Sequence, residues 1–246
     1  MQTRNAPMKS HESPTGVARS AARSKEPSGP DAVVEGHGQA RKTVPTLLHI
    51  DASPRGGLSI SRQLSAAAVA AWRNNNPAGS VIARDLSETK MTFVDLNWIV
   101  GSRGTPEQQT DSTKRALVLS DELVAELLEA DEMVIGTPMY NFAIPAVLKA
   151  WIDYVVRPGK TFAYGAAGPE GLAKGRRALI AVASGGSYDA ASGWDYEIPY
   201  LRHILGFIGI TDVKFIYAGG TVKVAQGQVS IDEFLGPLLP QIATAV

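Results

Sequence analysis

The sequence contains no cysteine and only four histidines. Without cysteine the chain forms no disulfide, no thiolate nucleophile and no cysteine-ligated zinc or iron–sulfur site. The histidines are scattered, and no two of them stand at a metal-ligand spacing: they are His11, His37, His49 and His203. We therefore predict no metal site, and redox chemistry would require an organic cofactor.

Net charge and long apolar runs are also missing. The chain has 24 Lys and Arg against 24 Asp and Glu, so it creates no overall field that attracts nucleic acid or anionic lipid. No apolar run has the length that a membrane-spanning helix needs, and the first residues lack the apolar segment of a signal peptide. These absences predict a cytoplasmic protein that binds neither nucleic acid nor a membrane.

Large apolar side chains are absent from the start of the chain. Residues 1–45 contain no Leu, Ile, Phe, Tyr or Trp, so they cannot bury enough apolar surface to offset the entropy of ordering. We predict a disordered N-terminal extension over residues 1–45. Its formal charge of +3 leaves a basic arm for an acidic partner as an alternative, but the charges are sparse and unclustered.

From residue 46 to residue 246 the sequence alternates between short apolar runs and amphipathic stretches, as in a parallel sheet covered by helices on both faces. Five parallel strands joined by right-handed crossovers most simply give a doubly wound sheet with the order 2-1-3-4-5. The fold class is therefore α/β and flavodoxin-like, with ligands expected at the carboxyl ends of the first and third strands. The predicted strands are Thr46–Asp51, Val81–Asp85, Glu132–Thr137, Ala178–Ala183 and Val213–Tyr217.

Helices are expected between and after the strands. The second of them should begin in a capping box at Thr105 and break near Ser120, which resembles a second cap. Leu86–Gly104 and Pro158–Gly175 exceed the minimal repeat, and we interpret them as insertions over the sheet edge or the site. The predicted helices are Ile60–Asn74, Pro106–Ala130, Pro145–Val156, Asp195–Phe207 and Ile231–Thr244.

The loop after the first strand reads Asp51-Ala-Ser-Pro-Arg-Gly-Gly-Leu-Ser-Ile-Ser61. Its hydroxyl groups, its two glycines and the amino terminus of the following helix are suited to binding a phosphate group. Neither G-x-G-x-x-G nor the P-loop Gly-Lys-Ser/Thr occurs there, which disfavours a Rossmann dinucleotide or a nucleoside triphosphate. Serines that only cap the helix remain an equal alternative for this loop alone.

Two further loops follow the third and fourth strands. Thr137-Pro-Met-Tyr-Asn-Phe142 places apolar and aromatic residues at the mouth of the sheet, where they suit a flat ring, although a hydrophobic cluster or a subunit interface would use the same residues. Ala183-Ser-Gly-Gly-Ser-Tyr188 permits close backbone approach, and taken alone it would be an ordinary glycine-rich turn. The fold brings all three loops together, and this conjunction favours a ligand site.

The segments Thr137–Phe162, Gly168–Leu172 and Leu205–Phe215 closely resemble the FMN-dependent NADH azoreductases, also described as NADH:quinone oxidoreductases. The resemblance covers about residues 46–220 and is far longer than a chance match. It implies FMN as cofactor, NADH or NADPH as electron donor, quinones and azo compounds as substrates, and a homodimer with the flavin site at its interface. Trp98, Trp151 and Trp194 could lie in that interface, although core packing is the simpler interpretation of each.

The resemblance also assigns cofactor-binding positions. The family's phosphate-binding residues correspond to Ser53, Ser59, Ile60 and Ser61, and its ring-binding stretch corresponds to Met139, Tyr140, Asn141 and Phe142. A loop often written Ser-Arg-Gly-Gly in the family is here Ala183, Ser184, Gly185 and Gly186. The glycines are kept, whereas the guanidinium is lost, which puts nicotinamide preference and substrate range in doubt more than flavin binding.

The implied function is an enzyme in which FMN carries the chemistry and no side chain is catalytic. Donor and acceptor would use one open flavin face in turn, with backbone groups near Asn141, Gly185 and Gly186 stabilising the reduced ring. Tyr188 and Lys160–Tyr164 are expected to wall the substrate.

Two other classes of protein fit the sequence less well. A non-enzymatic flavodoxin-like electron carrier is the main alternative, although such a carrier would show a charged docking face. A hydrolase ranks lower, because the sequence has no Gly-x-Ser-x-Gly elbow, no cysteine and no base near Ser53.

Overall fold

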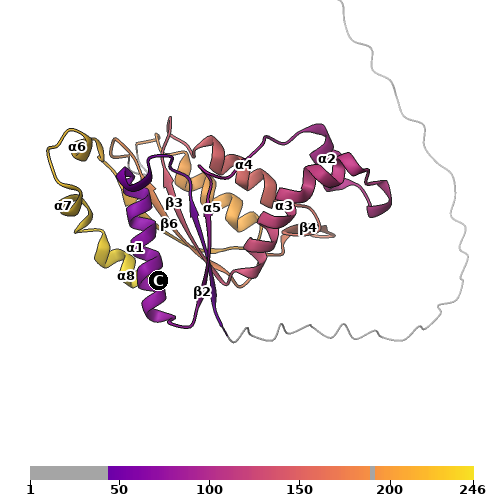
Figure 1. Cartoon of the computed structure of the whole chain (residues 1–246), viewed down its shortest axis with the longest axis horizontal. Helices are drawn as coiled ribbons and strands as arrows, with labels where there is room; N and C mark the ends of the chain where they lie inside the picture. Colours follow the sequence, from indigo (N-terminus) through magenta and orange to yellow (C-terminus); the bar gives the residue numbers. More distant parts are fainter. Residues whose placement is uncertain (1–43, 189–191) are drawn as a thin grey trace, which may run out of the picture. The chain divides into compact units, whose positions relative to one another are not determined.

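The computed structural model describes residues 44–188 and 192–246, and of the predicted extension only Val44 and Pro45 lie among these residues. Five parallel strands form one sheet with the order β2-β1-β3-β6-β7 (Figure 1). This order confirms the flavodoxin-like prediction, and every predicted strand end agrees within one residue. The strands are β1 (Thr46–Asp51), β2 (Ser80–Asp85), β3 (Glu132–Pro138), β6 (Arg177–Ala183) and β7 (Asp212–Ala218).

Helices cover both faces of the sheet, and each face has its own hydrophobic core (Figure 1). The larger core contains Trp98 and Trp151, which are buried as core residues, and the smaller core lies under the helix that follows β1. One face carries α1 (Ile60–Asn75), α7 (Ile231–Leu235) and α8 (Leu239–Ala245), and the other carries α3 (Asp111–Glu129), α4 (Ala146–Val155) and α5 (Glu197–Phe207).

The helix α1 lies unusually close to the sheet at Gly136 of β3. A Cβ atom at this position would stand 2.5 Å from Asp51 Oδ1 and 2.9 Å from the Ser61 carbonyl oxygen, distances that real Cβ atoms do not adopt. Glycine therefore allows the first turn of α1 to approach the ends of β1 and β3. This contact positions the amino terminus of α1 at the switch point of the sheet.

Two helix predictions were wrong in detail. The predicted helix Pro106–Ala130 does not break near Ser120: it divides earlier, into a short 3₁₀ turn, η2 (Pro106–Gln108), and α3. The capping box that starts α3 is formed by Thr110 and Thr113. Ser120 is buried within the helix, and its hydroxyl donates to the Tyr154 carbonyl at 2.6 Å, so it anchors α3 to α4.

The predicted helix Ile231–Thr244 is also divided, into α7 and α8. Pro237 and Pro240 stand between and at the start of these helices, and proline has no N–H to continue the hydrogen-bond pattern. The helix α6 (Val222–Ala225) was not predicted.

The two long insertions contain a helix and a β-hairpin that we did not predict from the sequence. Leu86–Gly104 contains α2 (Leu96–Arg103), which Asp95 caps through its side chain. Pro158–Gly175 contains a hairpin of β4 (Phe162–Gly165) and β5 (Gly168–Gly171). A Cβ on Gly171 would stand 2.3 Å from the carbonyl carbon of Ile208, so the hairpin packs on the carboxyl end of α5, at the amino-terminal edge of the sheet.

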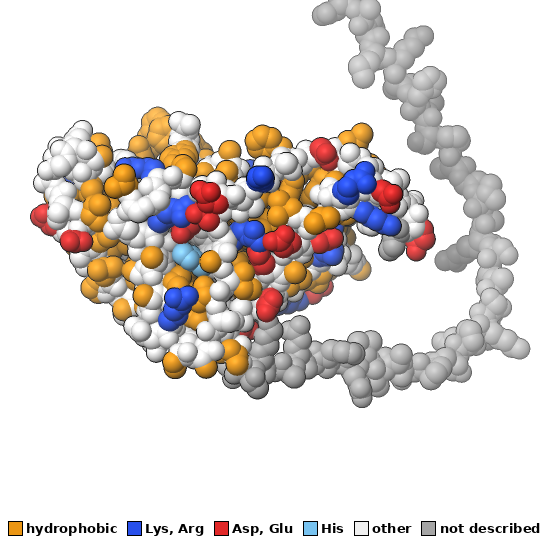
Figure 2. Space-filling model, viewed as in Figure 1, with side chains coloured by type: hydrophobic (Ala, Val, Ile, Leu, Met, Phe, Trp, Pro, Cys, Tyr) orange, Lys and Arg blue, Asp and Glu red, His pale blue; other side chains and the backbone are white. Residues whose placement is uncertain are grey.

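On the face drawn in Figure 2, neither positive nor negative side chains dominate the surface. Figure 2 shows Lys and Arg side chains interspersed with Asp and Glu side chains across this face. Within residues 44–188 and 192–246, no helix is long and apolar enough to cross a bilayer.

Candidate functional site

The amino terminus of α1 forms the first part of the candidate site. A 3₁₀ turn, η1 (Gly56–Leu58), leads into α1, and Ser59 is its N-cap residue, accepting from the Arg62 amide at 3.4 Å. The Ser59 and Ser61 hydroxyls are buried and 3.1 Å apart. In the described part of the chain, the amides of Ile60 and Ser61 donate no hydrogen bond. The capping interpretation is therefore correct for Ser59, and two amides and a hydroxyl pair remain available for an anion.

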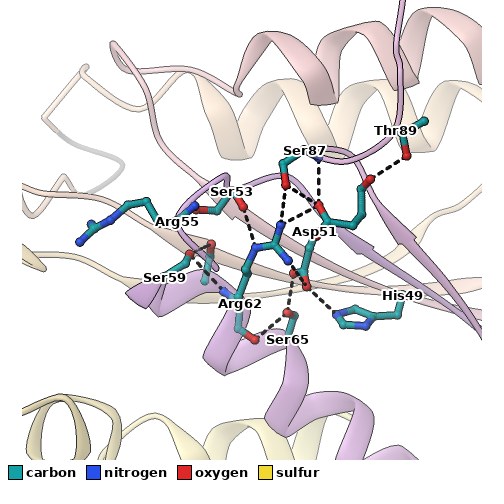
Figure 3. A network of polar contacts seen from close by, with 11 residues as sticks. His49, Asp51, Ser53, Arg55, Ser59, Arg62, Ser65, Ser87 and Thr89 are labelled. Atoms are coloured by element: carbon teal, nitrogen blue, oxygen red, sulfur yellow. Dashed lines mark hydrogen bonds and ion pairs between the residues drawn. The ribbon is translucent and has the colours of Figure 1, made fainter. Parts of the chain in front are cut away.

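Arg62 holds this loop in place from below (Figure 3). Its Nε atom donates to the Ser53 carbonyl at 2.6 Å, and its remaining nitrogens contact Asp51 at 3.5 Å and Asp85 at 2.6 Å. Burial would raise the pKa of Asp85, but hydrogen bonds from Arg62 and Ser87 outweigh it and lower that pKa to about 2. The guanidinium is thus neutralised by carboxylates and serves to fix the loop, whereas the Arg55 side chain points away from the network (Figure 3).

The loop after β3 forms a tight turn from Tyr140 to Ala143. Two backbone hydrogen bonds close it, Tyr140 N to Ala143 O at 2.9 Å and Ala143 N to Tyr140 O at 3.1 Å. Both central residues have positive φ, +50° at Asn141 and +70° at Phe142, as in a type I′ turn. Asn tolerates this conformation, whereas for Phe it costs about 1–3 kcal/mol of conformational free energy. Such a cost at a loop after a strand points to a functional constraint.

Aromatic contacts support the strained residue. The Phe142 ring lies 5.6 Å from the Tyr188 ring and 4.9 Å from the Trp194 ring, measured between centroids. The Phe142 carbonyl accepts from the Tyr196 amide at 3.1 Å. Trp194 is 54% exposed, so it extends the aromatic surface of this turn and does not belong to the core.

The loop after β6 lies beside this turn. The Met139 amide donates to the Ala183 carbonyl at 2.8 Å, which joins the two loops. Ser184 is buried, and its hydroxyl contacts the Gly186 carbonyl at 2.6 Å and the Tyr217 hydroxyl at 2.7 Å. Among the residues that the structure describes, the amides of Gly185 and Gly186 donate no hydrogen bond. The Ser184 side chain is therefore committed to the protein, and the glycine amides are the groups free for a ligand.

These loops enclose one cavity and border a groove. The cavity has a volume of about 300 Å³ and the groove about 980 Å³, and Tyr140 belongs to both. The cavity is lined by Ser53, Arg55, Ser59, Ile60, Pro138, Met139, Tyr140, Ala183, Gly185, Thr221, Val222 and Ala225. The groove is lined by Tyr140, Asn141, Ala143, Ile144, Pro145, Ala146, Lys149, Asp195, Tyr196, Pro199 and Tyr200. The three predicted loops therefore meet around a continuous space.

The structure adds residues that the sequence did not indicate. Thr221, and Val222 and Ala225 of α6, line the cavity just beyond β7. The rule that ligands bind at strand carboxyl ends could have found them, because Gly219-Gly220 directly follows that strand. Tyr196 and Tyr200 of the groove carried no recognisable pattern. The expected substrate wall at Lys160–Tyr164 lies in the hairpin at the opposite edge of the sheet, so within one chain it does not reach the cavity.

A buried acid lies beneath the turn that follows β3. Glu197, in the first turn of α5, is 0% exposed, and its Oε1 accepts from the Thr137 hydroxyl at 2.9 Å. Its Oε2 has no hydrogen-bond partner among the described residues. Burial raises the pKa of Glu197 to about 9, the Thr137 hydrogen bond opposes this, and the Asp195 charge adds to it. The carboxyl group is therefore protonated at neutral pH.

The arrangement fits FMN. The amino terminus of α1 offers hydroxyls and unpaired amides to a phosphate group. The two loops after β3 and β6 offer unpaired amides at Gly185 and Gly186 and an aromatic turn to a flat ring. Within the described residues, no three His, Asp or Glu side chains are placed to hold a metal ion.

Comparison with known proteins agrees with this geometry. A family model described as flavodoxin-like fold matches residues 45–237. The FMN-dependent NADH:quinone oxidoreductase 2 of Jannaschia sp. (strain CCS1) is 45% identical over 205 residues, covering 82% of this chain and 99% of that protein. The FMN-dependent NADH:quinone oxidoreductase 8 of Burkholderia lata is 46% identical, covering 82% of this chain and 96% of that protein.

Solved structures give the same assignment. An azoreductase from Bacillus anthracis str. Sterne superposes with a TM-score of 0.74 at 28% identity, covering 82% of this chain and 98% of that one. An FMN-dependent NADH-azoreductase from Bacillus anthracis str. Ames Ancestor, in complex with FMN, has a TM-score of 0.71 at 25% identity, covering 82% of this chain and 97% of that one. The chain belongs to the flavodoxin-like family of FMN-dependent NADH:quinone oxidoreductases and azoreductases.

Proposed function

We propose that this chain is an FMN-dependent oxidoreductase that transfers two electrons from NADH or NADPH to quinones and reductively cleaves azo compounds. The observation that carries the proposal is the meeting of a phosphate-binding helix terminus and two loops with unpaired amides around one cavity. FMN, when bound, supplies the two-electron chemistry. The relatives named above bear the names of this activity.

The proposed roles of the residues follow from their positions. Ser53, Ser59, Ile60 and Ser61 would hold the phosphate group at the α1 terminus. Met139, Tyr140, Asn141 and Phe142 would bound the ring on one side, and Ala183, Ser184, Gly185 and Gly186 on the other. Unpaired amides aimed at the pyrimidine end of the ring would stabilise the negative charge that reduction places there.

We further propose a single pocket for both substrates and a ping-pong mechanism. The groove beside Tyr140 is a large space lined mainly by aromatic and aliphatic residues, and it shares Tyr140 with the cavity, so NADH and the acceptor would enter it in turn. Double-reciprocal plots with quinone varied at several NADH concentrations should give parallel lines. Intersecting lines would refute the shared pocket, and absence of NADH consumption would favour an electron carrier.

We also propose that the protein is a cytoplasmic homodimer with this groove at the interface. Tyr140, Trp194 and Tyr196 are 41%, 54% and 64% exposed, and exposed aromatic patches of this kind commonly mark interfaces. In a homodimer, the hairpin of β4 and β5 could wall the site of the other chain. Sedimentation equilibrium of the purified protein would test the dimer, and a monomer at micromolar concentration would refute it.

A further inference from the structure

The hydroxyl of Tyr217 on β7 lies at the centre of a hydrogen-bond relay inside the loop Ser184–Tyr188. The Ser184 hydroxyl is 2.7 Å from the Tyr217 hydroxyl and 2.6 Å from the Gly186 carbonyl, and the Tyr188 amide donates to the Tyr217 hydroxyl at 2.8 Å. Each hydroxyl has one proton. The Tyr217 hydroxyl also lies 3.4 Å from the Gly186 carbonyl, but the Ser184 hydroxyl is much closer to that carbonyl, at 2.6 Å. The relay is therefore formed when Ser184 donates to Gly186, Tyr217 donates to Ser184, and the Tyr188 amide donates to Tyr217.

The relay and the neighbouring loop fix the direction of the peptide groups. The Ser184 carbonyl accepts from the Thr221 amide and hydroxyl, both at 3.0 Å, and the Gly185 carbonyl accepts from the Val222 amide at 3.3 Å. In a planar trans peptide the N–H points opposite to the C=O. Tying these two carbonyls to the loop after β7 therefore turns the amides of Gly185 and Gly186 away from that loop, and Gly185 lines the cavity.

The same hydroxyl connects this loop to the strained turn after β3. Tyr217 holds the Tyr188 amide, and the Tyr188 ring packs edge-on against Phe142 at 5.6 Å. A Cβ on Gly186 would stand 2.7 Å from the Tyr188 hydroxyl, so the end of the ring lies against the Gly186 backbone. A displacement of Tyr188 would therefore reach both Gly186 and Phe142.

We propose that Tyr217 is a positioning residue for the redox reaction: through Ser184 and Tyr188 its hydroxyl braces the loop whose Gly185 and Gly186 amides Thr221 and Val222 orient, and through Tyr188 it supports the turn at Phe142. The inference rests on the proposed function, because it assigns these two loops to the FMN ring. Tyr217 itself would not touch the ring. Its effect would come through the amides that stabilise the reduced ring.

The test is Tyr217→Phe, which removes one oxygen atom and keeps the ring packed, together with Ser184→Ala. Tyr154→Phe is the matched control, because the Tyr154 hydroxyl also makes a part-buried hydrogen bond, to Thr92 at 2.5 Å, but Tyr154 belongs to α4 and to the core. If the proposal is right, Tyr217→Phe and Ser184→Ala each weaken FMN and riboflavin binding by about tenfold. The midpoint potential of bound FMN becomes more negative in both variants and stays unchanged in Tyr154→Phe.

Equal weakening of FMN and riboflavin would place the defect at the ring, since riboflavin lacks the phosphate. The proposal would be overturned if Tyr217→Phe kept wild-type flavin affinity and midpoint potential. It would also be overturned if Tyr217→Phe lost only thermal stability and Tyr154→Phe lost it to the same extent.

Hydrogen exchange of the apoprotein tests the coupling without flavin: Tyr217→Phe should accelerate exchange at the Tyr188 amide, which the hydroxyl holds, and at the hydrogen-bonded amides of Met139 and Tyr140. Exchange that rises in only one loop would refute the coupling. A wild-type chain that binds no FMN would instead refute the proposed function.

Discussion

The buried carboxyl group of Glu197 makes stability depend on pH in a way that one substitution should remove. Glu197 is 0% exposed, and its pKa is raised from 4.5 to about 9, chiefly by burial. The unfolded chain therefore loses this proton near pH 4.5, whereas the folded chain keeps it until about pH 9. Between these values folding must take up a proton, so the stability contribution is full below the lower pKa and is lost as the pH rises through the higher one.

The size of the effect follows from this linkage. One proton corresponds to about 1.4 kcal/mol of unfolding free energy per pH unit, so raising the pH from about 6 to about 8 should cost about 2.7 kcal/mol through Glu197. Glu197→Gln keeps an oxygen acceptor for the Thr137 hydroxyl and cannot ionise. The difference in stability between wild type and variant should shift by that amount in favour of the variant, while other titrating groups cancel in the comparison.

Urea unfolding of the apoprotein at several pH values, followed by tryptophan fluorescence, measures this difference. Glu170→Gln is the matched control, because the Glu170 side chain is 59% exposed and its hydrogen bond with Lys174 lowers its pKa, so it stays ionised throughout the range. A difference between wild type and Glu197→Gln that does not change with pH would refute the reasoning. It would mean that Glu197 is ionised in the folded chain.

Two predictions concern the loops of the site. Replacing both Ser59 and Ser61 with Ala should weaken FMN binding at least about 100-fold while riboflavin binding changes little, because two hydrogen bonds to a charged phosphate are lost; fluorescence titration measures both, and equal losses would contradict the assignment. At Phe142, Gly should be more stable than Ala by about 1 kcal/mol, because only Gly relieves the positive φ. Both variants should slow reduction by NADH and reoxidation by quinone together in stopped-flow, and a defect confined to one half-reaction would contradict a shared pocket.

The sheet could be predicted because its three central strands, β1, β3 and β6, are buried on both faces. Runs such as Thr46–Asp51 and Ala178–Ala183 are nearly continuous apolar segments bounded by Gly, Pro or Ser, and parallel strands of this kind have few alternative pairings. The three loops were found for the same reason, because the strand ends place them. Helix ends were harder: a serine in a helix can cap it or bind its neighbour, and at Ser120 it bonds to the Tyr154 carbonyl.

The less visible parts of the site depend on contacts between segments far apart in sequence. In the sequence, Glu197 resembles an exposed acidic residue in the first turn of a helix. It is buried in the structure, where it accepts a hydrogen bond from Thr137. Tyr217 looks like an ordinary strand residue, and its role depends on a loop 33 positions away along the chain. Asn141 did carry a local signal, because Asn favours positive φ in a tight turn, but Phe142 beside it argued against that turn.

A site built from backbone groups explains how the replacement of the family's usual Ser-Arg by Ala183-Ser184 can be tolerated. The directions of the Gly185 and Gly186 amides are set by the hydrogen bonds of Thr221 and Val222 to the Ser184 and Gly185 carbonyls, and no guanidinium takes part. Ser184 adds to this anchoring, because its hydroxyl points into the protein and binds the Gly186 carbonyl. The amides that we propose as donors to the ring are therefore kept, while the guanidinium of the family's usual arginine is missing. We expect the replacement to alter the choice between NADH and NADPH, whose phosphates interact with such a charge, and to leave FMN binding intact.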